Sequence, residues 1–250
     1  MTSELQTVEI RTAHVKVQNG ALQIDAYLAE PVGEGPFPAI VVLQEIFGVN
    51  EHIRDVSERF AKAGFVAIAP ALYQRVAPGF ETGYTPDDIT VGRQYKDQTK
   101  AEELLGDIEG AIAYLKTLPS VKPGSIGAIG FCFGGHVAYL AATLPDIKAT
   151  ASFYGAGIPT MLPGGGDPTV TRTSAIHGTL HLFFGLDDPS IPPEHIEQIE
   201  SALQEHHVSY QIFRYPGAQH GFFCDRRASY NADAASDAWN KALALFRSSL

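Results

Sequence analysis

Short apolar segments alternate with amphipathic ones along most of the chain. On either side of Asn19-Gly20, single apolar and polar residues alternate, which predicts an antiparallel hairpin from segments 8–17 and 22–28. Continuous apolar runs predict six further buried strands, at residues 37–43, 65–69, 125–131, 147–154, 179–184 and 208–215. Apolar residues at helical spacing predict five helices, at residues 51–63, 100–118, 134–144, 193–204 and 231–250.

The order of these segments predicts the fold class. Strands that alternate with helices form a mostly parallel central sheet with helices on both faces. We therefore expect an α/β protein with a single domain spanning residues 1–250, because no linker-like change in composition divides the chain. Segments 71–99 and 155–178 are irregular, and we expect them to be loops or cap elements.

The composition excludes some classes of function. A net charge of −10 and a pI near 5.3 argue against nucleic acid or an anionic membrane as the partner. Two cysteines make no disulfide framework, and the first 20 residues contain no apolar core of a signal peptide. We therefore expect a cytoplasmic protein, a monomer or small homo-oligomer, that binds a small molecule. The histidines and cysteines lack metal-binding spacings, so no metal or cofactor is expected.

The stretch Gly130-Phe131-Cys132-Phe133-Gly134 has the spacing of the nucleophile elbow G-x-S-x-G, with cysteine in place of serine. A nucleophile on a sharp strand-to-helix turn needs small residues two positions away on either side, because the backbone crowds there. The N-terminus of the following helix favours a thiolate at Cys132. The alternative is an inert cysteine buried in a glycine-rich turn.

Polar residues follow two later strands in the chain order that α/β-hydrolases use. Asp187 and Asp188 follow one strand, and His220 follows the last. Because parallel strands end at the same edge of a sheet, we expect Cys132, one aspartate and His220 to form a triad there. The other aspartate is expected to be a turn residue. Four of the other histidines are expected to lie on the surface: His52, His195, His206 and His207.

Three motifs resemble those of the dienelactone hydrolases (carboxymethylenebutenolidases). They are Gln44-Glu45-Ile46-Phe47-Gly48-Val49-Asn50, Gly130-Phe131-Cys132-Phe133-Gly134-Gly135 and Gly217-Ala218-Gln219-His220-Gly221-Phe222. The resemblance extends from the first hairpin to the last helix and implies an α/β-hydrolase fold. It also implies that Asp188 completes the triad, because Asp188-Pro189-Ser190-Ile191-Pro192 matches the family's segment from aspartate to proline.

The same resemblance assigns roles near the triad. The backbone N–H groups of Ile46 and Phe133 would form an oxyanion hole. Glu45, which by itself is either a functional carboxylate or a solvated loop residue, would contact the resting thiol of Cys132. Such a contact would keep the thiol neutral until substrate displaces Glu45, so we expect slow alkylation of Cys132 by iodoacetamide near neutral pH.

The substrate-binding residues match the family only in part. Tyr95 matches a tyrosine that binds the dienelactone carboxylate in the chlorocatechol-pathway enzymes. The two arginines with that role are unmatched, because Val91 and Cys224 stand in their places. Arg226 and Arg227 lie close enough along the chain to substitute, although surface charge at a helix start also explains them.

The sequence therefore predicts a hydrolase that cleaves a lactone or carboxylic ester through a Cys132 acyl-enzyme. One alternative is a broad esterase or thioesterase, or a catalytically weak relative that binds a small ligand. Another is a redox-sensing thiol protein that uses Cys132 and Cys224, although Cys224 is also explained as a plain buried residue. A reversible disulfide between these two cysteines would favour the sensor.

Overall fold

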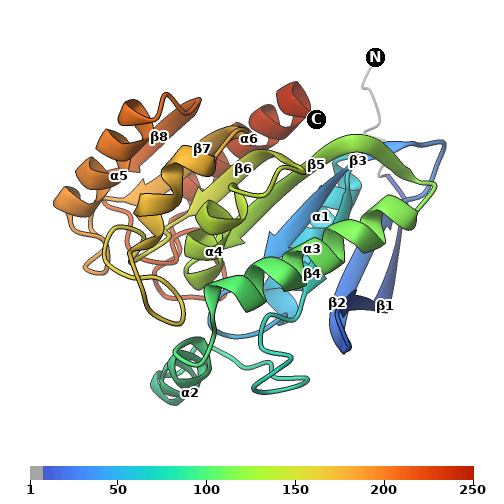
Figure 1. Cartoon of the computed structure of the whole chain (residues 1–250), viewed down its shortest axis with the longest axis horizontal. Helices are drawn as coiled ribbons and strands as arrows, with labels where there is room; N and C mark the ends of the chain where they lie inside the picture. The colour runs from blue at the N-terminus through green and yellow to red at the C-terminus, as the bar shows by residue number, and fades with distance from the viewer. Residues whose placement is uncertain (1–7) are drawn as a thin grey trace.

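The computed structural model describes residues 8–250, whose strands form one eight-stranded sheet in the order β1-β2-β4-β3-β5-β6-β7-β8 (Figure 1). The strands are β1 (Ile10–Asn19), β2 (Leu22–Pro31), β3 (Phe37–Leu43), β4 (Val66–Pro70), β5 (Val121–Phe131), β6 (Ile147–Phe153), β7 (Thr179–Gly185) and β8 (Tyr210–Tyr215). The pairs β1–β2 and β2–β4 are antiparallel, and the remaining pairs are parallel.

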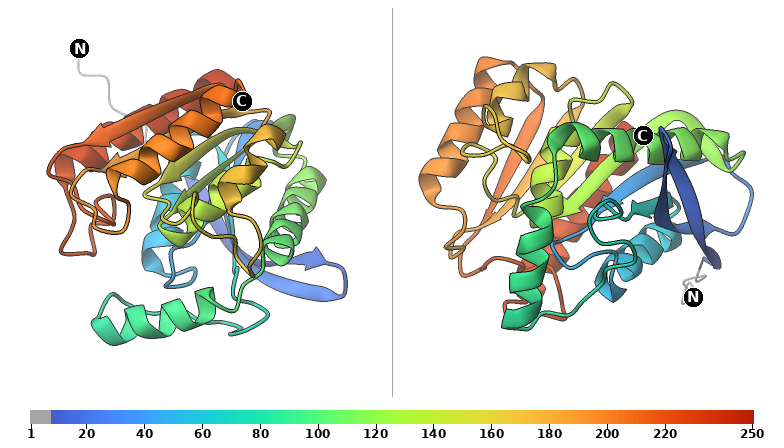
Figure 2. Two further views of the ribbon diagram at one scale, coloured as in Figure 1. Left: turned by 60° about the vertical axis from the view of Figure 1, so that its left-hand side comes forward. Right: turned by 60° about the horizontal axis from the view of Figure 1, so that its bottom comes forward.

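The α-helices are α1 (Glu51–Lys62), α2 (Pro86–Lys96), α3 (Ala101–Thr117), α4 (Phe133–Ala141), α5 (Pro193–Glu205) and α6 (Ala232–Ser249). α1 and α6 lie together on one face of the sheet, where the rings of Phe60 and Phe246 have centroids 5.7 Å apart. α3 and α4 lie on the other face (Figures 1 and 2). The predicted mostly parallel sheet with helices on both faces is confirmed.

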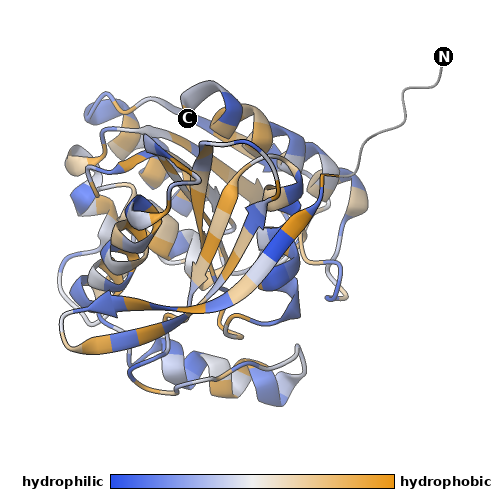
Figure 3. Cartoon of the chain, turned by 90° about the vertical axis from the view of Figure 1, so that its right-hand side faces the viewer, coloured by the Kyte–Doolittle hydropathy of each residue, from blue (hydrophilic) through white to orange (hydrophobic). Residues whose placement is uncertain are grey.

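The central strands are buried from both sides, whereas β1, the outer strand of the hairpin, is not. Every residue of β4 is buried, while most residues of β1 are exposed or partly exposed. Apolar residues accordingly concentrate in the middle of the sheet (Figure 3). This difference in burial explains why the central strands have continuous apolar sequences and the hairpin an alternating one.

Segment 71–99, which we expected to be irregular, contains the helix α2. It begins with a capping box, in which the side chains of Thr85 and Asp88 each accept a hydrogen bond from the other's backbone N–H. Gly92 is the one buried residue among those of this helix, so the sequence has no apolar stripe that would reveal it. α2 lies beyond the carboxyl ends of the strands, away from the sheet (Figure 2). Gly92 packs against the Ile46 carbonyl so closely that a Cβ would overlap it, which holds α2 against the loop after β3.

Smaller differences concern the ends of elements and the second irregular segment. β5 begins at Val121, before the predicted residue 125, and segment 155–178 contains the 3-10 helix η1 (Thr169–Ala175). Within residues 8–250, no helix combines the length and the apolar character that crossing a bilayer requires. The single-domain organisation stays a prediction, which the one continuous sheet supports.

Candidate active site

Cys132 occupies the sharp turn between β5 and α4, at the carboxyl edge of the sheet. Its φ of 56° lies in the left-handed region, which is unfavourable for residues other than glycine. The flanking glycines are required, because a Cβ on Gly130 would overlap the Gly134 carbonyl and a Cβ on Gly134 would overlap the Leu43 carbonyl. The N–H of Cys132 donates to the Phe153 carbonyl at 3.0 Å, which anchors the turn to β6. These are the features of a nucleophile elbow.

His220 lies in the loop after β8, and its Nδ1 is 2.7 Å from Oδ2 of Asp188. Asp188 is buried, and its other oxygen accepts a hydrogen bond from the Ser190 N–H at 2.8 Å. Because an ionised carboxylate only accepts, Nδ1 of His220 carries a proton. Asp187 is exposed. Asp188, rather than Asp187, is therefore the aspartate that orients His220.

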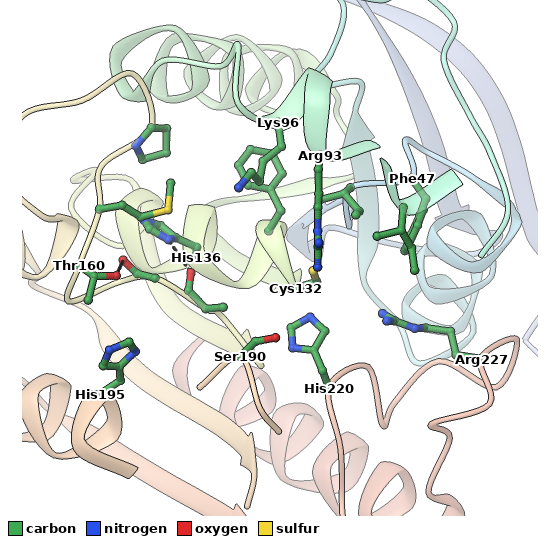
Figure 4. A pocket seen from close by; sticks show the side chains of 17 residues that line it. Phe47, Arg93, Lys96, Cys132, His136, Thr160, Ser190, His195, His220 and Arg227 are labelled. Carbon is green, nitrogen blue, oxygen red and sulfur yellow. Dashed lines mark hydrogen bonds between the residues drawn. The ribbon is translucent and has the colours of Figure 1, made fainter. Parts of the chain in front are cut away.

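Cys132 and His220 line the same pocket (Figure 4). Burial lowers the pKa of His220, but a thiolate at Cys132 and the Asp188 carboxylate outweigh this effect and raise that pKa to about 10. The structure thus brings together the three residues that the sequence placed at three strand ends.

Glu45 is buried in the loop after β3, where its Oε1 accepts a hydrogen bond from the Arg227 guanidinium at 2.9 Å. Among the residues that the structure describes, its other oxygen, Oε2, has no hydrogen-bond partner. The expected contact between Glu45 and the resting thiol of Cys132 is therefore not formed here. The physical reason is that a permanently charged guanidinium binds a carboxylate more strongly than a neutral thiol does.

A cavity of about 390 Å³ lies beside Cys132, a volume suited to a small molecule. Its lining includes three cations, Arg93, Lys96 and Arg227, and within residues 8–250 no Asp or Glu lines it. Lys96 pairs with Asp97 and Arg227 pairs with Glu45, and neither carboxylate lines the cavity. Within residues 8–250, Arg93 has no acidic partner. The cavity is therefore cationic, although the whole chain carries a net charge of −10.

The other predicted site residues divide into two groups. Ile46 and Phe133, the proposed oxyanion-hole residues, line the pocket beside Cys132. Tyr95 and Arg226 do not line it, which differs from the expectation. The Tyr95 ring faces away into an aromatic cluster, with its centroid 4.8 Å from that of Phe80. Arg226 lies outside the pocket because its exposed side chain pairs at 2.7 Å with Glu51 of α1.

Sequence reasoning missed the pocket residues that come from α2 and from the helix after the elbow. Arg93 and Lys96 lie one turn apart on α2, whose helical pattern was too weak to predict. His136 lies on α4, with Nδ1 2.9 Å from the Ala156 carbonyl and Nε2 2.6 Å from the Thr169 hydroxyl. Burial lowers the pKa of His136 to about 4, so the ring is neutral. His136 therefore ties α4 to segment 155–178, the other wall of the pocket.

Two of the histidines expected at the surface lie elsewhere. His195 lines the pocket, and His52 is buried because α1 packs its ring against that of Phe131, with centroids 5.8 Å apart. His206 and His207 are exposed, as predicted. Position on a helix face, which depends on where the helix docks, decides between the two outcomes.

Cys224 is buried behind the pocket, and both cysteines are free thiols. Its Sγ is 3.4 Å from the Tyr84 hydroxyl, and burial together with the Glu45 charge raises the pKa of Cys224 to about 12. Within residues 8–250, one group of three potential metal ligands has its ligand atoms within 4.8 Å of one another: Glu45, His52 and Cys224.

The parallel sheet, the elbow at Cys132 and the later strand ends that carry Asp188 and His220 define an α/β-hydrolase fold. The chain belongs to the dienelactone hydrolase family, whose sequence model matches residues 24–250. The crystal structure of a "Putative Dienelactone Hydrolase" from Klebsiella pneumoniae superposes with a TM-score of 0.86 at 30% identity, covering 96% of this chain and 99% of that one. The resemblance seen in the motifs and the fold that it implied are both confirmed.

Two curated relatives carry names that describe an activity. A "Putative carboxymethylenebutenolidase" of Synechocystis sp. is 62% identical, covering 98% of this chain and 99% of its own length. A "Probable 2-oxo-3-(5-oxofuran-2-ylidene)propanoate lactonase" of Bradyrhizobium sp. is 33% identical, covering 89% of this chain and 88% of its own length. Family membership makes this chain a hydrolase of the lactone and ester class that acts on a small-molecule substrate.

Proposed function

We propose that this protein hydrolyses a small anionic lactone through an acyl-enzyme on Cys132. The observation that carries the proposal is the pocket in which Cys132 and His220 meet, with His220 held at 2.7 Å by Asp188. His220 accepts the thiol proton, and the sulfur forms a bond to the lactone carbonyl carbon. The ring C–O bond then breaks, and His220 returns the proton to the leaving oxygen. Water, deprotonated by His220, cleaves the thioester and regenerates the thiol.

The remaining residues near the elbow stabilise this reaction. The negative charge that develops on the carbonyl oxygen would accept hydrogen bonds from the N–H groups of Ile46 and Phe133, which border the pocket. Asp188 keeps the proton on Nδ1 of His220, so that Nε2 is available to the thiol. No step requires a metal or an organic cofactor.

The charge of the pocket supports an anionic substrate. Arg93, Lys96 and Arg227 border a cavity lined by no carboxylate of residues 8–250, so a substrate carboxylate would be attracted and held there. The Bradyrhizobium relative is named for a lactone that bears such a carboxylate. Arg93 is the cation best placed to bind it, because it has no acidic partner in the described chain.

Glu45 has a proposed role that depends on its ion pair with Arg227. A substrate carboxylate that competes for Arg227 would weaken the 2.9 Å bond to Glu45. Glu45 would then be free to accept the thiol proton of Cys132 in place of His220, as the family resemblance implies.

The test is pre-steady-state hydrolysis of p-nitrophenyl acetate, followed by mass spectrometry of the quenched protein. We expect a burst of nitrophenol and an added acetyl group on the peptide that contains Cys132. The Cys132→Ala variant should show neither, while Cys224→Ala should show both. Hydrolysis without an acyl adduct, at a rate that Cys132→Ala preserves, would place the reaction at another residue.

The substrate class requires a second comparison. A panel of lactones and esters of matched size, with and without a carboxylate, should show higher kcat/KM for the anionic members. Equal values for the two sets would contradict the anionic substrate and favour the broad esterase.

A further inference from the structure

Behind the catalytic pocket lies a buried group of three side chains that the proposed reaction leaves largely unused. Glu45 comes from the loop after β3, His52 from the first turn of α1, and Cys224 from the loop that follows His220. All three are buried, with exposed fractions of 1%, 3% and 0%. The carboxylate oxygen, the ring nitrogen and the sulfur that point together lie within 4.8 Å of one another.

Two of these residues carry a buried polar atom that is unsatisfied. Oε2 of Glu45 and Nε2 of His52 have no hydrogen-bond partner among residues 8–250, although both are buried. Buried polar atoms without a partner are unfavourable and are rare in folded proteins. Packing fixes the His52 ring, since its edges meet the rings of Phe131 and Phe223 at centroid distances of 5.8 Å and 6.1 Å. Side chains held rigidly with open acceptors are prepared for a ligand between them.

The chemistry of the donor atoms favours zinc. A thiolate, an imidazole nitrogen and a carboxylate oxygen are the three ligand types that Zn²⁺ takes in proteins. Tetrahedral zinc with bonds of about 2.0–2.3 Å separates its ligand atoms by about 3.5 Å, so small side-chain rotations would close the group around it. Glu45 and a Cys224 thiolate would each bring a negative charge to Zn²⁺, while Arg227 stays paired with the other oxygen of Glu45.

One of the three residues, His52, also borders a surface hollow that is separate from the catalytic pocket. This hollow is lined by both His52 and Tyr84, and the Tyr84 hydroxyl is 3.4 Å from the Cys224 sulfur. Glu51 and Glu81 also line the hollow, where they pair with the lining residues Arg226 and Arg54.

We propose that Glu45, His52 and Cys224 form a zinc site, and that zinc bound there inhibits the enzyme. Zn²⁺ would bind Oε2 of Glu45 and Nε2 of His52, and it would replace the thiol proton of Cys224, which is released to solvent. Arg227 would keep its bond to Oε1 of Glu45, so both carboxylate oxygens would be held. Glu45 could then no longer move toward Cys132. The inhibition rests on the proposed function, whereas the binding of zinc does not.

The binding test uses the Cys132→Ala variant, because it removes the competing catalytic thiol and leaves Cys224 as the one cysteine of the chain. Chelator-treated protein is titrated with ZnSO₄ by calorimetry and with CoCl₂ by absorption spectroscopy. We expect one equivalent of each metal to bind. We also expect a thiolate-to-cobalt charge-transfer band, which in this background identifies Cys224 as a ligand. A titration with no band and no heat above that of free buffer would overturn the proposal.

Variants then identify the other ligands. In the same background, His52→Gln should weaken zinc binding by at least ~100-fold, since it removes one of three ligands. The exposed histidine His206 provides the matched control, and His206→Gln should bind zinc as the parent does. Circular dichroism and thermal unfolding establish that each variant is folded. If His52→Gln is folded and binds zinc as the parent does, the site is not the one proposed.

The inhibition test uses protein with Cys132 intact. Zinc should reduce kcat for hydrolysis of a carboxylate-bearing lactone, chelator should restore it, and the zinc concentration for half inhibition should rise by at least ~10-fold in His52→Gln. Stoichiometric binding in Cys132→Ala without inhibition of the intact enzyme would overturn the regulatory half of the proposal. Inhibition that His52→Gln leaves unchanged would assign it to zinc on Cys132 and His220 instead. If neither lactone nor ester is hydrolysed at all, the proposed function is wrong. The zinc site is then still decided by the metal titration of Cys132→Ala.

Discussion

The molecule contains two groups made of the same three residue types, a cysteine, a histidine and an acid. In the first, Cys132 and His220 border an open pocket, and the buried Asp188 has a partner on each oxygen. In the second, Cys224, His52 and Glu45 are buried, and two of their polar atoms have no partner within residues 8–250. The composition of a site therefore does not decide its chemistry.

Two physical differences separate the groups. The first is how the side chains pair. Asp188 binds His220, which leaves the opposite ring nitrogen for Cys132. Glu45 binds Arg227 instead of His52, and Nε2 of His52 has no hydrogen-bond partner among residues 8–250. The second is access, since the elbow turns Cys132 into the pocket while Cys224 lies against Tyr84 in the interior. A group whose members bind one another beside an open pocket suits proton transfer, whereas a buried group with unpaired polar atoms suits the capture of a cation.

Replacing each cysteine by alanine gives the largest expected contrast. Cys132→Ala should lower kcat/KM for lactone or ester hydrolysis by at least ~10³-fold, because binding and the oxyanion hole alone then remain. Cys224→Ala, measured in parallel with zinc absent, should stay within about 3-fold of the parent, since it touches no reacting atom. Similar losses in both variants would mean that the two groups act as one site.

The acids provide the next contrast. Asp188→Asn should lower kcat by ~10²-fold or more, because an amide can neither stabilise the imidazolium nor keep the proton on Nδ1 of His220. Asp187→Asn is the matched control on the neighbouring exposed residue, with an expected change within about 3-fold. Steady-state kinetics of the two variants decide the assignment, and the reverse order would show that the pairing of Asp188 with His220 is not the functional one.

Arg227 joins the two groups, because it lines the pocket and binds Glu45. Arg227→Gln should raise KM for carboxylate-bearing lactones by ~10-fold, since a charge-assisted hydrogen bond to the substrate is lost. Its effect on neutral esters of the same size should be smaller. Arg226→Gln is the control, because Arg226 is exposed and pairs with Glu51. An equal rise in KM for neutral and anionic substrates would remove Arg227 from carboxylate binding.

The smallest expected effect is a change in the pKa of His220. NMR of the isotope-labelled imidazole ring measures this pKa in a pH titration. Its pKa of about 10 depends in part on a Cys132 thiolate, so Cys132→Ala should lower that pKa. Cys224→Ala should leave it unchanged. An unaltered His220 titration in Cys132→Ala would show that the thiolate–imidazolium pair does not form.

The same pKa predicts how stability depends on pH. The folded-state pKa of His220 lies above the unfolded value of about 6.5, so the protonated ring stabilises the fold fully below pH 6.5. That contribution should decline as the pH rises from 6.5 toward 10. Urea unfolding at several pH values should show a steeper decline in the free energy of unfolding for the parent than for Cys132→Ala.

The strands, most helices and the turn at Cys132 could be predicted because their signals are local in the sequence. A buried strand requires a run of apolar residues, and the elbow requires Gly130 and Gly134 next to Cys132 in the chain. Helix α2 could not be predicted, because it buries Gly92 and little else and therefore needs no apolar stripe. With α2 missed, the pocket cations Arg93 and Lys96 were missed as well, and Tyr95 on the same helix was expected in their place.

The sequence by itself determined the parallel sheet, the sharp turn at Cys132 and the strand ends that Asp188 and His220 follow, because burial and backbone crowding restrict residue types position by position. It could not determine which distant side chains meet. Positions 45, 52 and 224 lie on three separate elements, and their closeness depends on how β3, α1 and the loop after β8 dock. The docking of these elements also pairs Arg227 with Glu45, buries His52 and keeps Arg226 exposed to solvent. Pairing between distant charges depends on three-dimensional distance and burial, and neither is encoded in the spacing of residues along the chain.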